Sequence, residues 1–326
     1  MRKTIYDIAK EAGLSASTVS RYLNNIKVSD QAKEKLDKVL ANSDFRLNQI
    51  ARGLTLKQTK TIGIMTVDIR VPHYSEVTYT FEQCFSAKGY NVIICSTSGS
   101  ITKSIDYIKK LMSLQVDGIA FVGSVFNELN GKEEVLSLLK DTPIVIANGF
   151  INLDNAISVL FDDFEGSALA VKYMYNKKRT RICFINDMHT KSAMLKEDGY
   201  KKTMLELGLK EVDIFTPNSI DSGEKIVSEI YKDHLLYDGI ICADDVVAVG
   251  LINALMEKGV KVGHDVDVIA FNNTIYGKMT LPKLTCIDND AVLQGKLLAE
   301  KLENMINNKE ETSYMIEPKL IIRGSA

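Results

Sequence analysis

The chain lacks the features that mark several large classes of protein. Its five cysteines are scattered, odd in number and without a Cys-x-x-Cys pair, which indicates reduced thiols and favours the cytosol. No signal peptide precedes Thr4. No apolar run approaches the ~18 residues that a membrane span needs. We therefore expect a cytoplasmic protein with no membrane segment.

Catalytic and metal-binding motifs are also missing. The sequence has no glycine-rich phosphate loop, no Gly-x-Ser-x-Gly turn and no His-Glu-x-x-His, and its four histidines lie far apart. Adjacent carboxylates occur at Asp162–Asp163 and Asp244–Asp245, but neighbouring side chains diverge, and one Asp of each pair is expected to cap the next helix. We predict no enzyme, no cofactor and no metal site, although a fold alone does not exclude catalysis.

Charge is distributed unevenly along the chain. The 45% apolar and 25% charged residues are ordinary for a globular protein, and the net charge is only −2. Residues 1–60 nevertheless carry 12 Lys/Arg against 6 Asp/Glu, whereas the remainder carries 28 against 36. This pattern indicates a polyanion-binding head on an acidic body with another role. The length of 326 residues allows two or three domains.

Residues 4–24 predict two short helices joined by a glycine turn. From Ile5, Ile and Ala recur at i, i+3, i+4 and i+7, which is the spacing of one helix face. Gly13 can adopt the left-handed conformation that ends a helix, and Ser15 can cap the next one. A third helix follows, with Ser29 as its cap and an apolar stripe of Ala32, Leu36, Val39 and Leu40.

The second of these helices has an apolar side and a polar side. Val19 and residues 22–23 share the apolar side, whereas Ser17 and Arg21 point away from it, flanked by hydroxyl side chains. This pattern suits a DNA major groove, because Arg can pair bidentately with guanine and hydroxyls can reach bases or phosphates. For this segment alone, an ordinary helical hairpin with a solvated outer face is the alternative.

Residues 47–59 form a linker with a weak helical pattern. Ile50 and Leu54 are four residues apart with Arg52 between them, and Gly53 costs a helix ~1 kcal/mol relative to alanine. A helix this short does not persist alone in water. We expect it to form on DNA and to melt otherwise, with a plain flexible linker as the alternative.

From Thr61 onward, apolar strand-like runs alternate with helical stretches. This alternation predicts an α/β core with doubly wound parallel sheets. The pattern restarts near residues 158–162, which indicates two lobes, and a late helix at 292–306 and a strand at 319–323 are expected to cross back between them. One predicted helix covers residues 79–88. The expected division is a three-helix helix-turn-helix domain at 1–46, a hinge helix or linker at 47–59, an N-terminal lobe at 60–160 plus 288–318, and a C-terminal lobe at 161–287 plus 319–326.

With these elements in order, the chain resembles the lactose/galactose repressor (LacI/GalR) family of bacterial transcription regulators over essentially its whole length. The matching segments are Ile5–Gly13, Ser15–Asn24, Ala51–Leu54, Thr61–Ile64, Val116–Ile119, Leu284–Thr285 and Leu320–Arg323. The resemblance implies a homodimer, or a dimer of dimers, on a near-palindromic double-stranded DNA operator. It also implies a core with the fold of periplasmic sugar-binding proteins. The lack of a heptad tail after Arg323 favours the dimer.

The resemblance also assigns residues to the DNA contact. Ala16, Ser17 and Arg21 match base-reading positions, and Leu54 matches a leucine that enters the minor groove, where an apolar wedge can unstack a base step and bend the duplex. The expected DNA-binding residues are Thr4, Ser15, Ala16, Ser17, Thr18, Ser20, Arg21, Asn48, Arg52 and Leu54.

An effector is expected between the lobes, at the carboxyl ends of the parallel strands. A ligand that rotates one lobe against the other can change the hinge spacing and hence the affinity for DNA. The resemblance nominates His73, Tyr74, Asn148, Asp162, Lys196, Asp245 and Asn272 as effector-binding residues.

Two of these positions depart from the usual family pattern. Lys196 stands where Arg is common, and Asn272 stands where Asp is common. Lysine offers a point charge without the bidentate fork of arginine, and asparagine removes a negative charge while it keeps hydrogen bonding. Both a neutral sugar and an anionic derivative such as a sugar phosphate are therefore open as effectors.

The sequence predicts a DNA-binding regulator, most simply a repressor of carbohydrate-related genes. Two alternatives stay open. One is a cytosolic sugar-binding protein with the same core fold, against which the basic head argues. The other is a regulator that answers to a protein partner in place of a metabolite.

Overall fold

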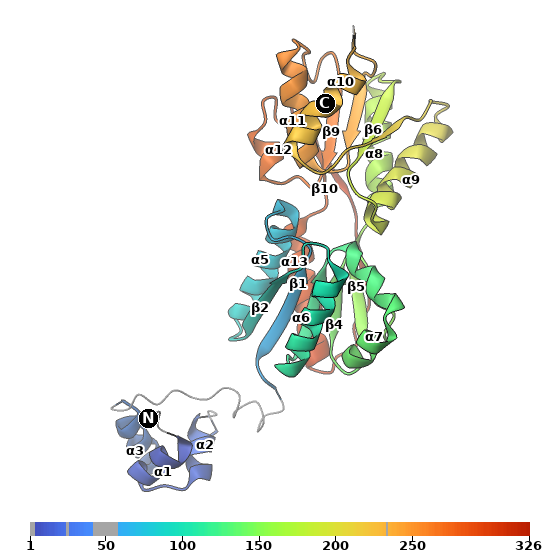
Figure 1. The fold of residues 1–326 in the computed structure, drawn as a ribbon. Coiled ribbons are helices and arrows are strands. Elements are labelled where there is room, and N and C mark those ends of the chain that lie inside the picture. The colour runs from blue at the N-terminus through green and yellow to red at the C-terminus, as the bar shows by residue number, and fades with distance from the viewer. Residues whose placement is uncertain (1–3, 24–25, 42–57, 233) are drawn as a thin grey trace. The chain divides into compact units, whose positions relative to one another are not determined.

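The computed structural model describes residues 4–23, 26–41, 58–232 and 234–326. The chain forms two compact units, Met1–Lys60 and Thr61–Ala326, which we call the head and the core (Figure 1). Three residues of the predicted hinge contact, Asn48, Arg52 and Leu54, lie outside the described residues.

The described part of the head contains the three predicted helices. Thr4 and Asp7 cap the first helix reciprocally, and Gly13 follows it at φ 62°, the left-handed conformation expected of a glycine cap. The Ser15 hydroxyl accepts a hydrogen bond from the Thr18 amide at 3.2 Å and so caps the second helix. The helices are α1 (Ile5–Ala12), α2 (Ala16–Leu23) and α3 (Asp30–Ala41). Their shared core consists of Ile8, Ala9, Ala12, Val19 and Leu36.

The first lobe of the core is a six-stranded parallel sheet in the order β11-β5-β4-β3-β1-β2. Its strands are β1 (Thr61–Thr66), β2 (Asn91–Ser96), β3 (Gly118–Val122), β4 (Ile144–Ala147), β5 (Ala156–Phe161) and β11 (Tyr314–Ile316). Helices α5 and α13 lie on one face of this sheet and α6 and α7 on the other (Figure 1). Their apolar side chains pack against the sheet in two separate clusters. These elements are α5 (Pro72–Ser86), α6 (Ile101–Ser113), the 3-10 helix η1 (Ser124–Gly131), α7 (Glu133–Leu139) and α13 (Ala291–Ile306).

The second lobe is a six-stranded sheet in the order β12-β10-β9-β8-β6-β7, parallel except for β12 against β10. Its strands are β6 (Ile182–Asn186), β7 (Asp213–Phe215), β8 (Gly239–Cys242), β9 (Asp267–Phe271), β10 (Thr285–Asp288) and β12 (Lys319–Ile321). Helices α8 and α9 cover one face, and α10 and α11 cover the other. The helices are α8 (Asp163–Asn176), α9 (Lys191–Glu206), α10 (Ile220–Ile230), α11 (Asp245–Glu257) and α12 (Ile275–Met279).

Helices α10 and α11 approach each other through two glycines. A Cβ atom on Gly223 would lie 2.1 Å from the Val247 carbonyl oxygen, and one on Gly250 would lie 1.9 Å from that of Ile220. Both distances are far below a van der Waals contact. The absence of side chains at these two positions therefore sets how closely the helices pack.

The chain passes between the two sheets after β5, after β10 and after β11. As the late helix and strand predicted, α13 returns to the first lobe and β12 to the second. The β12 strand ends at Ile321, two residues before the predicted end, because its pairing with β10 extends only from Lys319 to Ile321. Each sheet therefore takes one edge strand from the last part of the chain.

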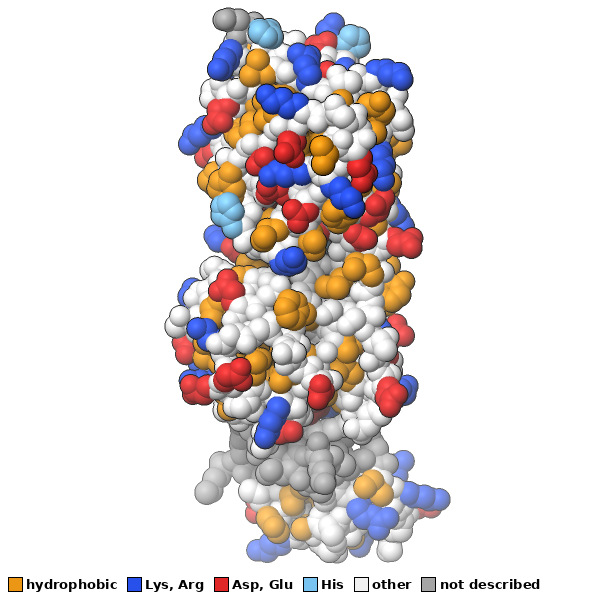
Figure 2. All heavy atoms as spheres, turned by 90° about the vertical axis from the view of Figure 1, so that its right-hand side faces the viewer, with side chains coloured by type: hydrophobic (Ala, Val, Ile, Leu, Met, Phe, Trp, Pro, Cys, Tyr) orange, Lys and Arg blue, Asp and Glu red, His pale blue; other side chains and the backbone are white. Residues whose placement is uncertain are grey.

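The core surface carries both signs of charge. Figure 2 shows Lys and Arg side chains interspersed with Asp and Glu over the face of the core that it presents.

None of the helices within the described ranges has the length and apolar character needed to cross a bilayer. In the same ranges, no three His, Cys, Asp or Glu side chains are grouped so that they could hold a metal ion.

Candidate functional site

Helix α2 presents the polar side that its sequence predicts. Ser17 and Arg21 are exposed, whereas Val19 on the opposite side is fully buried. The Arg21 guanidinium donates to the Lys27 carbonyl oxygen at 3.3 Å from an exposed side chain, and a guanidinium has five N–H donors in all. The buried side anchors α2 to the head and leaves Ser17 and Arg21 available to a partner.

The other hydroxyls predicted to contact DNA also hold the head together. The Thr4 amide donates to the Asp7 carboxylate at 2.7 Å, and the Thr4 hydroxyl bonds the same oxygen. The Ser15 hydroxyl lies 2.8 Å from those of Ser17 and Thr18. Ala16, Thr18 and Ser20 are half-buried on α2. Thr4 and Ser15 therefore have a structural task at the helix starts.

A cavity of about 60 Å³ lies between the two lobes of the core, at the carboxyl ends of the parallel strands. The first lobe supplies aromatic and amide side chains, and the second lobe supplies most of the charged ones. The lining residues are Val71, His73, Tyr74, Gly123, Ser124, Asn148, Asp163, Asp187, Met188, Thr190, Ser192, Ala193, Lys196, Ala243, Asp244, Asn272 and Asn289.

Five of the seven nominated effector residues line this cavity: His73, Tyr74, Asn148, Lys196 and Asn272. The other two, Asp162 and Asp245, are not among the lining residues.

Local helix geometry places those two carboxylates elsewhere. Asp162 caps α8 by accepting the Glu165 amide at 2.9 Å. Asp245 is fully buried and accepts the Thr274 amide at 2.7 Å. Their neighbours Asp163 and Asp244 face the cavity instead, because consecutive residues at a helix start point in different directions.

The sequence nomination also missed polar side chains that line the cavity. Asp187 and Asn289 each lie just beyond the end of a strand, which is where ligand-binding residues gather in such sheets. The strand-end rule could have found Asp187, because a predicted apolar run precedes it, but Asn289 follows a strand that the sequence pattern did not predict. Thr190 and Ser192 lie at the start of α9, and nothing in their local sequence distinguishes them from ordinary capping residues.

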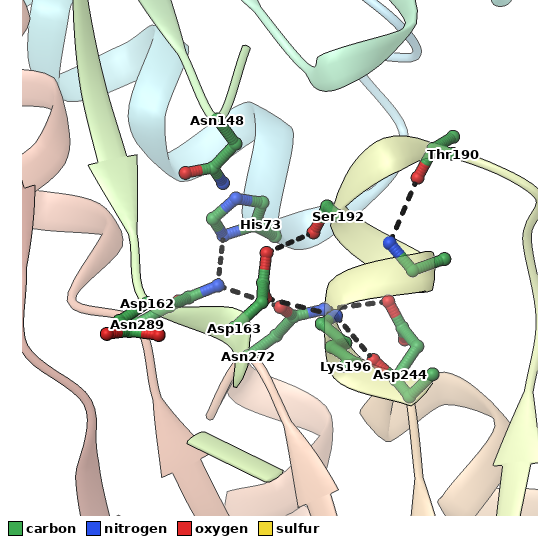
Figure 3. A network of polar contacts seen from close by, with 12 residues as sticks. His73, Asn148, Asp162, Asp163, Thr190, Ser192, Lys196, Asp244, Asn272 and Asn289 are labelled. Carbon is green, nitrogen blue, oxygen red and sulfur yellow. Dashed lines mark hydrogen bonds and ion pairs between the residues drawn. The ribbon is translucent and has the colours of Figure 1, made fainter. Parts of the chain in front are cut away.

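A chain of amide hydrogen bonds joins the two lobes at the cavity (Figure 3). The Asn272 amide donates to the Asp244 carboxylate at 2.8 Å. The Asn289 amide donates to the Asn272 carbonyl oxygen at 2.8 Å and lies 3.3 Å from Nδ1 of His73. The amide at position 272, where the family commonly has a carboxylate, thus serves as a donor to the carboxylate of the neighbouring strand end.

Lys196 is held by the protein itself. Its ammonium donates to the Ala243 carbonyl oxygen at 2.9 Å, lies 3.9 Å from the Asp163 carboxylate and stands 4.5 Å from the centre of the Phe271 ring (Figure 3). These contacts use the charge of Lys196 to compensate a buried carboxylate and the negative face of an aromatic ring.

Burial shifts the pKa values of several groups at this site. It raises the pKa of Asp163 to about 6, against the opposing effect of Lys196. It raises the pKa of Asp187 to about 7, with a further contribution from the neighbouring Asp244 carboxylate. Burial, together with the Lys196 charge, lowers the pKa of His73 to about 4, so its imidazole is neutral near pH 7.

Two family models match the sequence. Residues 4–48 match the model described as bacterial regulatory proteins, lacI family. Residues 171–326 match the model of a periplasmic binding protein-like domain. Among curated proteins, an HTH-type transcriptional regulator of Lachnoclostridium phytofermentans is 32% identical over 87% of each chain. The HTH-type transcriptional regulator RegA of Clostridium acetobutylicum is 33% identical over 100% of this chain and 99% of its own.

Solved structures share the fold. A lac repressor dimer bound to operator and the anti-inducer ONPF superposes with a TM-score of 0.88 at 21% identity, over 100% of this chain and 99% of that one. A periplasmic binding protein/LacI transcriptional regulator of Alkaliphilus metalliredigens, complexed with D-xylulofuranose, has a TM-score of 0.69 at 26% identity, over 82% and 98%. The head, the two-lobed core and these similarities agree: the chain belongs to the lacI family of bacterial regulatory proteins.

Proposed function

We propose that this lacI-family transcriptional regulator represses carbohydrate-related genes, binds a near-palindromic operator as a homodimer and responds to a sugar-like effector between its lobes. The observation that carries the proposal is the presence, in one chain, of an exposed Ser/Arg helix face and a polar cavity at the strand ends of a two-lobed core. Relatives named transcriptional regulators support the DNA-binding part. The sugar complex of the Alkaliphilus protein supports the effector part.

In this proposal α2 enters the major groove of the operator. Arg21 reads a base edge, and Ala16 and Ser17 fit the groove beside it. Lysine and arginine residues of the head neutralise phosphates, so binding falls steeply as salt rises. In the hinge, Asn48 and Arg52 contact DNA and Leu54 inserts into the minor groove, assignments that come from the family resemblance.

The effector side of the proposal rests on the cavity. His73, Tyr74, Asn148, Lys196 and Asn272 contact the effector, together with the lining carboxylates. Asp162 and Asp245 act indirectly, by capping α8 and by holding the Thr274 backbone.

The volume of the cavity bears on how the effector acts. At about 60 Å³ it is smaller than the roughly 300–1,000 Å³ typical of ligand pockets. An effector of sugar size therefore requires the lobes or the lining side chains to move. Such a movement can couple effector binding to the hinge and so to DNA affinity.

Three further assignments belong to the proposal. The functional segments are a DNA-binding domain at 1–46, a hinge at 47–59 and lobes at 60–160 plus 288–318 and at 161–287 plus 319–326. The protein works in the cytoplasm. It has no catalytic role, since the carboxylates of the two adjacent Asp pairs are engaged with helix starts, backbone amides or the Lys196 ammonium.

The test is capture of fragmented genomic DNA by the purified full-length protein, followed by sequencing, with and without a metabolite extract. We expect enrichment of one palindromic sequence beside sugar transport or catabolism genes. Arg21→Ala should strongly reduce the enrichment. Arg70→Ala, which removes an exposed arginine of the core, should leave it unchanged. No enriched sequence under either condition would contradict the regulator and favour a sugar-binding protein.

A further inference from the structure

The cavity between the lobes holds more negative than positive charge. Three carboxylates line it, and all are buried: Asp163, Asp187 and Asp244 are 4%, 9% and 7% exposed. Lys196 is the one basic side chain among the described residues that line the cavity, apart from the neutral His73. Its ammonium lies in ion-pair range of Asp163. Two carboxylates are therefore left without a matching cation.

Neutral groups are the hydrogen-bond donors to these two carboxylates. Asp187 accepts from the Asn218 side-chain amide. Asp244 accepts from the Val246 backbone amide at 2.8 Å and from the Asn272 side-chain amide at 2.8 Å. Within the described ranges, neither carboxylate takes part in an ion pair. Amide donors satisfy individual lone pairs but leave the net charge in place, and a buried charge is costly unless it is paired.

A second feature of the cavity also calls for a donor. Asn289 is 4% exposed and lines the cavity, and its amide nitrogen already serves Asn272 and His73. The carbonyl oxygen of the same side chain is buried and has no hydrogen-bond partner among the described residues. Nearly all buried side-chain acceptors are satisfied, so an unpaired one beside a ligand cavity marks a position for a ligand donor.

We propose that the effector is a hydroxylated small molecule with a protonated amino group, in chemical terms an aminated sugar or polyol. Its ammonium lies between Asp187 and Asp244, and one of its donors reaches the Asn289 carbonyl oxygen. The proposal deepens the proposed function, because it rests on this cavity being the effector site. It also argues against the anionic alternative, because a phosphate would meet three carboxylates and a lysine whose charge already faces Asp163.

The physical basis is charge compensation. An ammonium donating to a carboxylate forms a charge-assisted hydrogen bond, roughly twice as strong as a neutral one. Burial and the Asp244 charge raise the pKa of Asp187, because both disfavour its ionised form. A cation bound beside Asp187 would favour the ionised form and so offset both. A neutral sugar can donate hydroxyl hydrogens to the same oxygens but leaves the charge uncompensated.

Calorimetry on the full-length protein tests the proposal with two matched series. Each series contains a neutral hexose, its 2-amino-2-deoxy form and its 6-phosphate: glucose, glucosamine and glucose 6-phosphate, then galactose, galactosamine and galactose 6-phosphate. In at least one series we expect the amino form to bind about tenfold or more tightly than the neutral form, as one hydrogen bond to a charged group predicts. The phosphate should bind most weakly.

Two variants locate the effect. Asp187→Asn should remove most of the preference for the amino form. Asp198→Asn makes the same change on the exposed surface of α9, two residues after Lys196, and should keep the preference. Cooperative thermal unfolding of both variants without ligand checks that a lost preference reflects the site and not loss of the fold.

Each outcome has a definite meaning. A neutral or phosphorylated form that binds as tightly as the amino form would overturn the cationic effector and leave the effector site intact. A preference for the amino form that survives Asp187→Asn would overturn the placement of the ammonium. No binding in either series would contradict both this inference and the proposed role of the cavity.

Discussion

Replacing Asp187 by asparagine is expected to stabilise the core, and to do so more at pH 8 than at pH 5. Burial and the Asp244 charge raise the pKa of this carboxyl from 3.8 to about 7. At 1.36 kcal/mol per pKa unit, the ionised carboxylate then opposes folding by about 4 kcal/mol above pH 7. Asparagine occupies nearly the same volume, carries no charge and can still accept from Asn218 through its carbonyl oxygen.

The pH dependence follows from the sign of the shift. Because the pKa is higher in the folded than in the unfolded chain, the folded state binds the proton more tightly. The contribution of Asp187 to stability therefore falls as the pH rises from about 4 to about 7 and is constant above that. At about pH 5 the wild-type penalty is about 2 kcal/mol, so the advantage of the variant grows by roughly 2–3 kcal/mol between pH 5 and 8.

Thermal unfolding followed by circular dichroism measures this difference. Since 1 kcal/mol corresponds to about 2–4 °C in a domain of this order of size, the variant should melt roughly 8–16 °C above the wild type at pH 8, and less at pH 5. Asp198→Asn, on the exposed side of α9, should show no such trend. A stability gain that is equal at both pH values, or a loss at pH 8, would refute the charge imbalance that we infer for the cavity.

Three further substitutions test other parts of the molecule. Arg21→Ala should weaken operator binding by ~1–3 kcal/mol and relax the preference at one base position, measured by gel shift on operator variants; a uniform loss on all sequences would argue against base reading. Leu54→Ala should reduce operator bending, measured by fluorescence energy transfer between the DNA ends; unchanged bending would remove the wedge. Gly250→Ala should destabilise the core by ~1–3 kcal/mol in thermal denaturation, because its Cβ would lie 1.9 Å from the Ile220 carbonyl oxygen. Gly131→Ala, whose Cβ would meet no atom within 4 Å, is the control, and an equal effect in both variants would contradict the packing argument.

The alternating strands and helices of the core were predictable because buried strands are continuous apolar runs. The strand β3 (Gly118–Val122), for example, is such a run, and all of its residues are buried. Helix α5 was harder. The pattern predicted a helix at 79–88, but the helix begins at Pro72. Its first turn carries His73 and Tyr74, which face the cavity between the lobes. The second lobe covers these side chains, and a local sequence pattern cannot show a contact with so distant a part of the chain.

The sequence located the site at the ends of the parallel strands, but it did not show which side chains there face the cavity. The family resemblance nominated one carboxylate of each adjacent Asp pair, but helix geometry decides which carboxylate of each pair faces the cavity. Asp162 was nominated and caps α8, whereas Asp163 faces Lys196. In the second pair, Asp244 both caps α11 and lines the cavity. A rotation of about 100° per residue separates these roles, and sequence alone gives no reference for that angle.

The way the chain returns to both sheets near its end has a consequence for biosynthesis. Strand β11 completes the first sheet against β5, and β12 completes the second against β10. Domains generally fold as units while the chain is synthesised from its N-terminus. The three described helices of the head end at Ala41, so this part of the chain can fold early. Neither lobe can finish until the ribosome has delivered residues 314–321, so a chain released short of them leaves two open sheet edges at once, and quality control can recognise either.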